Sequence, residues 1–333
     1  MTDESDAKPA AQVELDAQVK PGAQVKPGAQ VKPAAKHKKS NALLNVMIAI
    51  SAIAMIGALG LIAYPTFSDW WNRMHQSYAV AGYVEQTKDM SGAERKAMLK
   101  AAHEYNERLA ANGDRWHMTD AQKREYDETL DVTGTGIMGY VTIPRIKVKL
   151  PVYHGTSDGV LQIAAGHLAG TSLPVGGATT HAVVSGHTGL PSARLLTGLD
   201  ELKKGDTFAF HVLDQTYTYK VDQISVVLPS EISKLNIESG ADYATLITCT
   251  PYGVNSHRLL VRGHRIPNPK VPDKTQYDEP GEMTAVAAAV IGLLVFVAGC
   301  AFVGLARLWR RSWIVRHGLC AGAGARHSSG VRG

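Results

Sequence analysis

Cys249 is the residue whose position most clearly suggests covalent chemistry. It ends an apolar stretch typical of a strand, Thr245-Leu246-Ile247-Thr248, and the turn sequence Pro251-Tyr252-Gly253 follows at once. The end of a strand beside a turn is where a rigid scaffold holds reactive groups. Arg258 opens the next strand of an apparent hairpin. A cation beside a thiol favours the attacking thiolate form, although an Arg here also fits an ordinary exposed strand position.

A thiol nucleophile usually works with a histidine that transfers protons. His187 stands in Ser185-Gly186-His187-Thr188-Gly189, where another strand end enters a glycine-bounded turn. The residues alone do not select it from the other histidines of the β-rich region, which are His154, His167, His181, His211, His257 and His264. The chain has no Cys-x-x-Cys or His-x-x-x-His spacing and no glycine-rich phosphate loop, so we expect no metal and no cofactor.

The elements that must position these residues begin at Gly139. Short segments rich in Val, Ile, Tyr and Thr follow, separated by Gly, Pro, Asp and Asn. They are GYVTIPRIKVKLPVY, HAVVSGH, DTFAFHVL, YTYKVDQISVVL, ATLITCT and HRLLVRGHRI. This spacing predicts an all-β sandwich or barrel of about 130 residues, which we place at 137–266.

Residues 65–136 have a helical pattern instead. Ser91 and Glu94 form a capping box ahead of apolar residues that share one helical face, and Asn112-Gly113 supplies the stop. Thr119 with Gln122 marks the start of a second short helix. A linker with four prolines, 267–284, follows the β-rich region.

Two apolar runs, 42–64 and 285–306, contain no charged side chain. About 20 apolar residues suffice to cross the hydrocarbon core of a bilayer. Basic residues precede the first run at 36–39, and residues 307–333 after the second hold six Arg and no acid. The positive-inside rule places both flanks in the cytoplasm. We therefore predict a cell-membrane protein with two spans, both termini cytoplasmic and the middle of the chain outside.

The formal charge of +5 is concentrated at the ends of the chain, because residues 41–306 hold 22 basic and 25 acidic side chains. This distribution argues against a nucleic-acid-binding domain. The tail at 1–41 contains AQVKPG at 17–22 and 23–28 and AQVKPA at 29–34. Its prolines and few large apolar side chains predict a disordered cytoplasmic tail.

Of the three cysteines, Cys300 lies in the second apolar run and Cys320 in the basic tail. Cys249 is therefore alone in the part expected outside the cell. Exported domains usually carry no cysteine or an even number of them. A lone exported thiol is either buried and inert or retained for its reactivity.

Five stretches of the β-rich region resemble the sortases, specifically the class C, pilin-polymerising branch. They are GYVTIP at 139–144, LPVYHGT at 150–156, GHLAGTSLP at 166–174, SGHTGLP at 185–191 and TCTPYGVNSHRL at 248–259. The second, C-terminal apolar run is also similar to class C. The resemblance implies an eight-stranded sortase β-barrel, preceded by the helical region and flanked by two transmembrane helices. It also implies a catalytic triad of Cys249, His187 and Arg258.

The resemblance further implies transpeptidation at a sorting signal, Leu-Pro-x-Thr-Gly or a relative. The Cys249 thiolate would attack the Thr carbonyl, break the Thr–Gly bond and form a thioester. His187 would protonate the departing amine and deprotonate the incoming one, while Arg258 would bind the oxyanion or hold the signal backbone. The partners would be the membrane, pilins and surface proteins with such signals, and a pilin Lys or a cell-wall amine as acceptor.

One departure from the family concerns a lid in front of the barrel, for which class C sortases typically carry an Asp-Pro-aromatic motif. The nearest match here is Asp114-Arg115-Trp116. The match predicts that Trp116 covers the thiol and that Asp114 pairs with a cation. Because Arg replaces Pro and a fixed φ is lost, we expect a looser lid. A plain loop between two helices is the alternative.

Three other functions are left open by the sequence. A housekeeping-type sortase would attach surface proteins to peptidoglycan. An L,D-transpeptidase also places an exported Cys and His on a β scaffold, but it expects Ser-His-Gly-Cys where this chain has Thr-Cys-Thr-Pro. A non-catalytic, membrane-tethered adhesin or scaffold would not need Cys249.

Overall fold

The computed structural model describes residues 42–270, 275, 277 and 285–318. The predicted tail at 1–41, much of the proline-rich linker and the C-terminal end lie outside the described residues. The chain divides into residues 1–46, of which only the beginning of the first helix is described, and residues 47–333, which hold the other elements.

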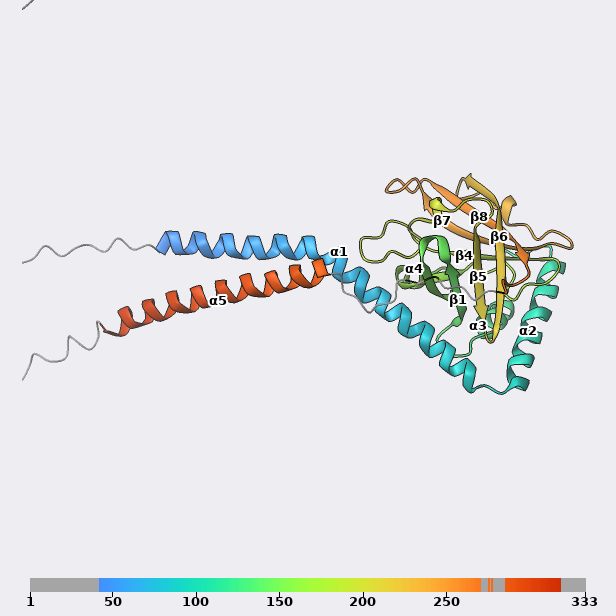
Figure 1. Cartoon of the computed structure of the whole chain (residues 1–333), viewed down its shortest axis with the longest axis horizontal. Coiled ribbons are helices and arrows are strands. Elements are labelled where there is room, and N and C mark those ends of the chain that lie inside the picture. The colour runs from blue at the N-terminus through green and yellow to red at the C-terminus, as the bar shows by residue number, and fades with distance from the viewer. Residues whose placement is uncertain (1–41, 271–274, 276, 278–284, 319–333) are drawn as a thin grey trace, which may run out of the picture. The chain divides into compact units, whose positions relative to one another are not determined.

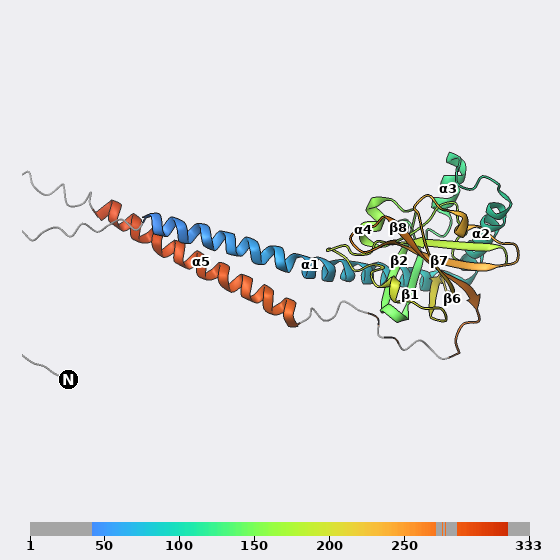
Figure 2. The same cartoon turned by 90° about the horizontal axis from the view of Figure 1, so that it is seen from above.

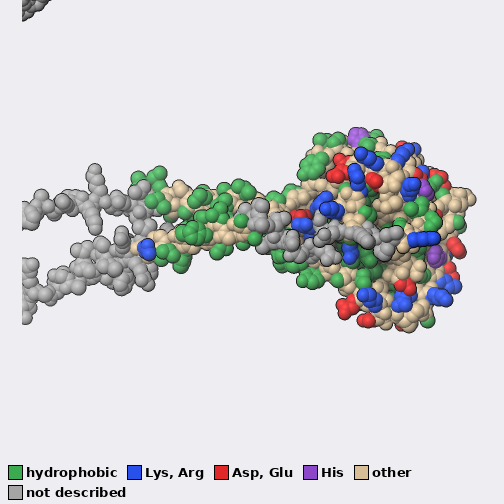
Figure 3. Space-filling view, in the orientation of Figure 1, with side chains coloured by type: hydrophobic (Ala, Val, Ile, Leu, Met, Phe, Trp, Pro, Cys, Tyr) green, Lys and Arg blue, Asp and Glu red, His purple; other side chains and the backbone are tan. Residues whose placement is uncertain are grey.

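Two long helices carry the apolar runs. Helix α1 (Ala42–Asp89) continues through Pro65 well beyond the predicted span, and from Val46 on it is long and apolar enough to cross a membrane. Helix α5 (Ala285–Gly318) has a shorter apolar stretch, Ile291–Gly304, among the residues that the structure describes. Figure 3 shows hydrophobic side chains along both helices, while most charged side chains lie over the rest of the molecule. Both helices are consistent with membrane anchoring, and the second span stays a prediction.

Eight strands form a closed barrel in the order β1-β2-β3-β4-β7-β8-β6-β5 (Figures 1 and 2). They are β1 (Ile137–Ile143), β2 (Val148–His154), β3 (Ala165–His167), β4 (Thr180–Ser185), β5 (Thr207–Val212), β6 (Gln215–Val227), β7 (Asp242–Thr250) and β8 (His257–Ile266). The pairs β2–β3 and β4–β7 are parallel, and the other pairs are antiparallel. The predicted eight-stranded barrel is confirmed. Short helices α4 (Asp158–Ile163), η1 (Pro144–Ile146), η2 (Leu199–Glu201) and η3 (Ser233–Leu235) lie in its connections.

Alternating side chains fill the barrel. In β5, Phe208 and Phe210 are buried, whereas Ala209 between them is half-exposed. The Phe208 ring stacks on Tyr219 of β6 at a centroid distance of 5.7 Å. This alternation has the period of two that a strand imposes, so the same rule decides on which face of the sheet each functional side chain lies.

The helical region packs on the barrel. The predicted capping box is present at the start of α2 (Gly92–Ala111). The predicted second helix, α3 (Asp120–Glu128), starts at Thr119 and also has a capping box. The Asn106 side chain in α2 pairs twice with the backbone of Leu173, accepting from its N–H at 2.7 Å and donating to its carbonyl at 3.1 Å. These bonds satisfy buried polar groups on both partners, and they fix α2 against the connection from β3 to β4.

Candidate active site

Cys249 and Arg258 face each other across neighbouring strands. Cys249 lies near the end of β7 and is the register partner of Arg258 at the start of antiparallel β8. Directly opposed residues of an antiparallel pair have Cβ atoms about 4.5–5.5 Å apart and side chains on the same face. This register therefore places the Cys249 thiol and the Arg258 cation side by side across the hairpin, as the sequence predicted.

The segment that leads to His187 pairs with the other side of β7. Strand β4 runs parallel to β7, with Ser185 opposite Ile247. The contact continues past the end of β4, since the Gly186 N–H donates to the Ile247 carbonyl at 3.0 Å and the Thr248 hydroxyl donates to the Gly186 carbonyl at 2.9 Å. Extending this register by one further step brings His187 beside Cys249.

The face that carries these residues lies outside the barrel interior. A small apolar cluster covers it, formed by Val183, Leu235, Ile247 and Leu260, with Trp116, Leu168 and Val227 packed against them; we call it the outer cluster. Ile247 precedes Cys249 by two residues and Leu260 follows Arg258 by two. Because side chains alternate along a strand, Cys249 and Arg258 project on the outer-cluster face.

The Arg258 guanidinium has donors to spare. Its Nη1 group donates to the carbonyls of Asn255 and His257, each at 3.2 Å. In the described part of the chain, no hydrogen bond is seen from its Nε or Nη2 groups. A planar fork of N–H groups beside a thiol is suited to bind a carbonyl oxygen that gains negative charge.

Two glycines that flank His187 are required by close packing. A Cβ on Gly186 would lie 2.8 Å from Leu196 Cγ, and Leu196 is fully buried. Gly189 has φ of +72°, and a Cβ there would lie 2.6 Å from the ring of Tyr252. Tyr252 belongs to the loop after Cys249, so the loops that carry the thiol and the imidazole pack directly on each other.

Two of the other histidines have structural roles. The pKa of His167 is lowered to about 3 by complete burial, and its Nε2 lies 2.8 Å from the Ser172 carbonyl while Nδ1 lies 3.0 Å from the Tyr126 hydroxyl. Burial also lowers the pKa of His181, whose ring lies between a loop carbonyl and the Thr245 hydroxyl. Neither ring can exchange protons with a substrate at the Cys249 face.

The remaining histidines lie elsewhere on the barrel. Both ring nitrogens of His154 face backbone carbonyls, and His211 stacks on Tyr140 at 4.4 Å. His264 pairs with Tyr243 at the opposite end of β7 from Cys249, whereas His257 pairs with Thr250. His257 is adjacent to Arg258 in its strand, so it projects on the other face. Local sequence could not select among the histidines, because the selection depends on the parallel pairing of β4 with β7.

The segment that resembles a lid packs beside this face. Trp116 contacts the outer cluster. Asp114 is exposed, and its carboxylate lies 2.7 Å from Nδ1 of His117 in the same loop. Among the hydrogen bonds, ion pairs and ring contacts that the described residues make, none joins this segment to Cys249. The predicted cover over the thiol stays a prediction.

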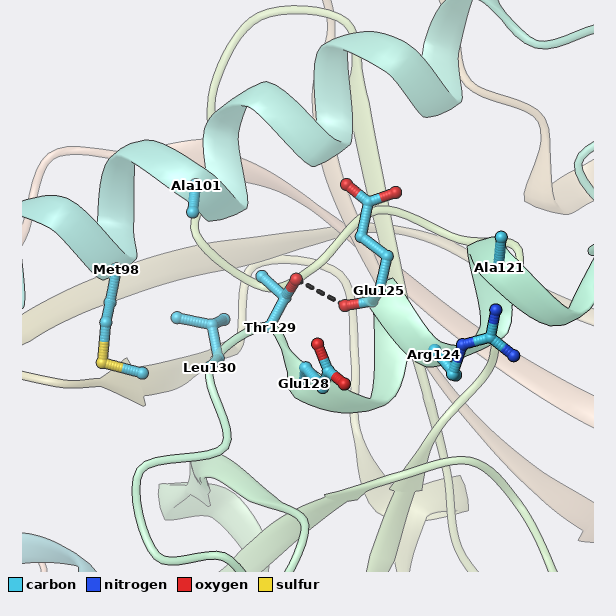
Figure 4. Close-up of a pocket in the computed structure, with 8 residues that line it drawn as sticks. All are labelled: Met98, Ala101, Ala121, Arg124, Glu125, Glu128, Thr129 and Leu130. Atoms are coloured by element: carbon cyan, nitrogen blue, oxygen red, sulfur yellow. Dashed lines mark hydrogen bonds between the residues drawn. The ribbon is translucent and has the colours of Figure 1, made fainter.

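A cavity between helices α2 and α3 lies apart from Cys249 and Arg258. It has a volume of about 420 Å³ (Figure 4). Its walls combine apolar side chains such as Met98 and Leu130 with Arg124, Glu125 and Glu128. Neither Cys nor His is among the residues that line it. Within the residues that the structure covers, no three His, Cys, Asp or Glu side chains are grouped so that they could hold a metal ion.

Comparison with known proteins identifies relatives of this chain. Residues 141–266 match the family model described as the sortase domain. The crystal structure of sortase C1 from Streptococcus agalactiae is 50% identical, with a TM-score of 0.57, and the match covers 58% of this chain and 100% of that one. Sortase C from Streptococcus pneumoniae is 45% identical, with a TM-score of 0.52 and coverages of 59% and 100%. Sortase C from Clostridium perfringens is 41% identical, with a TM-score of 0.51 and coverages of 58% and 100%.

Curated relatives of another class match less extensively. Sortase A of Streptococcus agalactiae is 30% identical over 117 residues, and the alignment covers 34% of this chain and 47% of that protein. Sortase A of Bacillus anthracis is 28% identical over 149 residues, with coverages of 43% and 69%. The chain thus spans about half the length of the first of these relatives, whereas it spans the full length of the class C structures.

Proposed function

The chain belongs to the sortase family of cysteine transpeptidases, and we propose that it is a class C sortase that joins pilin subunits through an acyl-enzyme on Cys249. The observation that carries this proposal is the register that sets Cys249 opposite Arg258. The parallel pairing of β4 with β7 supports it, since the continuation of that pairing past Ser185 would bring His187 to the same face. The class C structures match this chain at higher identity than the sortase A proteins do, which supports pilin polymerisation over attachment of surface proteins to peptidoglycan.

In the first half-reaction, the Cys249 thiolate attacks the Thr carbonyl carbon of a Leu-Pro-x-Thr-Gly-like signal. The carbonyl oxygen becomes negatively charged, and the free N–H groups of Arg258 stabilise it. The Thr–Gly bond then breaks, the departing Gly nitrogen takes a proton from His187, and a thioester remains on Cys249. The signal class is inferred from relatives, one of which, the Clostridium perfringens enzyme, was solved with the C-terminal cell wall sorting motif.

In the second half-reaction, a Lys amine of another pilin subunit attacks the thioester carbonyl. His187, now neutral, takes the proton that the amine loses, the C–S bond breaks and Cys249 leaves as thiolate. The product is an isopeptide bond. Pilin as the partner is supported by the pneumococcal sortase C, which has been discussed in terms of pilin substrate specificity.

We also propose a location for the reaction. The apolar part of α1 would cross the cell membrane, with residues 1–41 in the cytoplasm and the barrel outside, and α5 would return the chain through a second span. Phe67, Trp70 and Trp71 cluster at ring-centroid distances of 5.8 and 6.2 Å from Phe67. Such aromatic residues are enriched where a span meets the headgroups, and these follow the predicted span directly.

For the segment at 114–116, we propose that Trp116 covers part of the path to the thiol. This role is supported by the packing of Trp116 against the outer cluster, because one member of that cluster, Ile247, lies two residues before Cys249 in β7. The carboxylate of Asp114 would stabilise only the loop to which it belongs, through its contact with His117.

The proposal is tested by intact mass measurement of the full chain in detergent after mixing with a Leu-Pro-x-Thr-Gly peptide. The mass should rise by the Leu-Pro-x-Thr acyl group in the natural chain and in Cys300→Ala, and a Lys-containing peptide should remove it. The Cys249→Ala variant should show no adduct and a melting temperature near that of the natural chain, since Cys packs as a small apolar residue. An adduct on Cys249→Ala would refute an acyl-enzyme at this position.

A further inference from the structure

Arg115 is the one Asp, Glu, Lys or Arg that is buried among the residues the structure describes, with 8% of its surface exposed. Burying a charge is costly unless other groups replace its hydration. No carboxylate does so here, since none of the ion pairs between described residues involves Arg115. The side chain is therefore held by something other than a salt bridge.

The Arg115 side chain is held by backbone carbonyls from two connections that are distant in the sequence. The Nη1 group of Arg115 donates to the Gly170 carbonyl at 2.8 Å, and Nη2 donates to the Leu235 carbonyl at 3.0 Å. Gly170 lies between β3 and β4, and Leu235 lies between β6 and β7. The guanidinium also lies 4.3 Å from the ring centroid of its neighbour Trp116, within cation–π range. One side chain thus joins three segments that are remote in sequence.

The fit around this guanidinium is close. Gly170 has φ of +83°, and a Cβ there would lie 2.5 Å from the Arg115 carbonyl oxygen and 3.1 Å from the Trp116 ring. Only glycine meets both requirements. The backbone of the 112–117 loop is therefore seated directly on the connection from β3 to β4, in addition to the bonds from the side chain.

The connection from β6 to β7, residues 228–241, is held near its end by an ion pair of Glu238 with Arg262 at 3.6 Å and by the Gly240 N–H, which donates to the Thr179 hydroxyl at 3.0 Å. Nearly all of its side chains are exposed, and Leu235 is buried in the outer cluster. At the neighbouring Asn236, the carbonyl oxygen lies 2.8 Å from the His181 ring, and the side-chain oxygen accepts from Arg115 at 3.4 Å. Arg115 and His181 thus hold this connection at two adjacent residues, with Leu235 packed against the face that carries Cys249.

Resting on the proposed function, we infer that Arg115 is a positioning residue, which fastens Trp116 and the 228–241 connection as fixed walls of the surface where the substrate peptide lies. Both walls contribute to the outer cluster, in which Ile247 lies two residues before Cys249 and Leu260 lies two residues after Arg258. A wall that is already ordered does not have to be ordered when the peptide binds. The Arg that replaces the usual Pro therefore tightens the segment rather than loosening it.

The chemistry of the guanidinium makes this role specific to Arg. Its planar fork presents Nη1 and Nη2 in fixed directions to carbonyls on two different segments at once, whereas Lys has its three N–H donors on one nitrogen of a flexible stem. Arg115→Lys should therefore keep the positive charge but hold the two carbonyls less firmly. Arg115→Met removes both and keeps the apolar stem.

The first test is kinetic, on the full chain in detergent. We expect Arg115→Met to raise the KM for a Leu-Pro-x-Thr-Gly peptide about tenfold, with kcat changed less than about twofold, because a mobile wall weakens ground-state and transition-state binding alike. Arg115→Lys should lie between this variant and the natural chain. The matched control is Arg124→Met, an exposed Arg on α3, which should leave both constants unchanged.

The second test does not depend on activity. Hydrogen exchange of the full chain should show the amides of 229–241 exchanging about tenfold faster in Arg115→Met, as expected for local opening of a less stable segment, and unchanged in Arg124→Met. If the Met variant does not fold, Arg115→Lys carries the same comparison. Unchanged exchange at 229–241, or a loss confined to kcat, would overturn the inference. A natural chain that forms no acyl-enzyme would overturn the proposed function, and exchange alone would then decide the role of Arg115.

Discussion

Replacing Gly186 by Ala tests how tightly the barrel holds His187. The added Cβ would lie 2.8 Å from Cγ and 2.9 Å from Cδ1 of Leu196, closer than carbon atoms approach without movement. Leu196 is fully buried, and its N–H donates to the His187 carbonyl at 3.1 Å. Any shift of Leu196 is therefore passed to the residue proposed as the proton carrier.

The expected magnitude follows from overpacking. Forcing one extra methyl group into a packed core costs about 1–3 kcal/mol of unfolding free energy. A displacement of His187 by a fraction of an ångström should lower kcat for peptide cleavage by about tenfold or more, since about 1 Å of misplacement costs about a hundredfold. Both effects would be measured on one preparation, by thermal unfolding and by peptide cleavage kinetics.

Two comparisons make this prediction refutable. Gly82→Ala is the matched control, because a Cβ at Gly82 in α1 meets nothing within 4 Å, and stability there should be unchanged or slightly higher. The double variant Gly186→Ala with Leu196→Ala removes the clash, so its loss of stability should be smaller than the sum of the two single losses. Additive losses in the double variant, or full activity in Gly186→Ala, would show that Leu196 does not transmit strain to His187.

Three further predictions concern the loop at 114–116, acid stability and topology. Trp116→Ala should raise the rate at which a small thiol reagent labels Cys249 several-fold, while Asp114→Ala should leave it unchanged; equal rates in all three proteins would refute a cover. Burial lowers the pKa of His167 to about 3, so between about pH 6.5 and 3 this histidine is protonated in the unfolded chain and neutral in the folded one. The free energy of unfolding should therefore fall by about 1.4 kcal/mol for each unit by which the pH drops through this window. His167→Asn should flatten that slope in urea unfolding at stepped pH, and an unchanged slope would contradict the assignment. Protease added to wall-stripped cells should digest the barrel and spare an epitope tag placed after Gly333, whose digestion in sealed cells would refute two spans.

The sequence predicted those parts of the fold that depend on local patterns. The capping box at Ser91 and the start of a helix at Thr119 were predicted because the residues that interact there lie three positions apart. The all-β class followed from the length and spacing of the apolar segments, whereas the eight-stranded barrel was predicted through the resemblance. The three-residue strand β3 and the parallel pairing of β4 with β7 have no local signal, because they depend on segments that are distant in the chain.

The same distinction applies to the candidate site. The pairing of Cys249 with Arg258 was predicted because a hairpin joins them. His187 could be named only through the resemblance, since its neighbours belong to a strand about 60 residues later. In the sequence, Arg115 stands out only as the residue that takes the place of Pro in the lid motif. Its hydrogen bonds could not be predicted, because the carbonyls that accept them belong to residues 55 and 120 positions away.

Helix α1 continues past its apolar part to Asp89, and this continuation decides where a soluble version of the enzyme can be cut. The Tyr83 hydroxyl is buried, donates to the Met138 carbonyl at 3.1 Å and accepts from the Leu213 N–H at 2.7 Å. A fragment that begins at the first strand would leave both backbone groups without this partner, at a cost of about 1–3 kcal/mol for each buried group. A fragment that begins at residue 72 removes the apolar run and keeps Gln76, whose side chain donates to the Ile163 carbonyl at 2.7 Å. The helix that carries the apolar run is thus also a structural part of the domain that follows it, and separating the domain from that run requires a cut within α1 rather than after it.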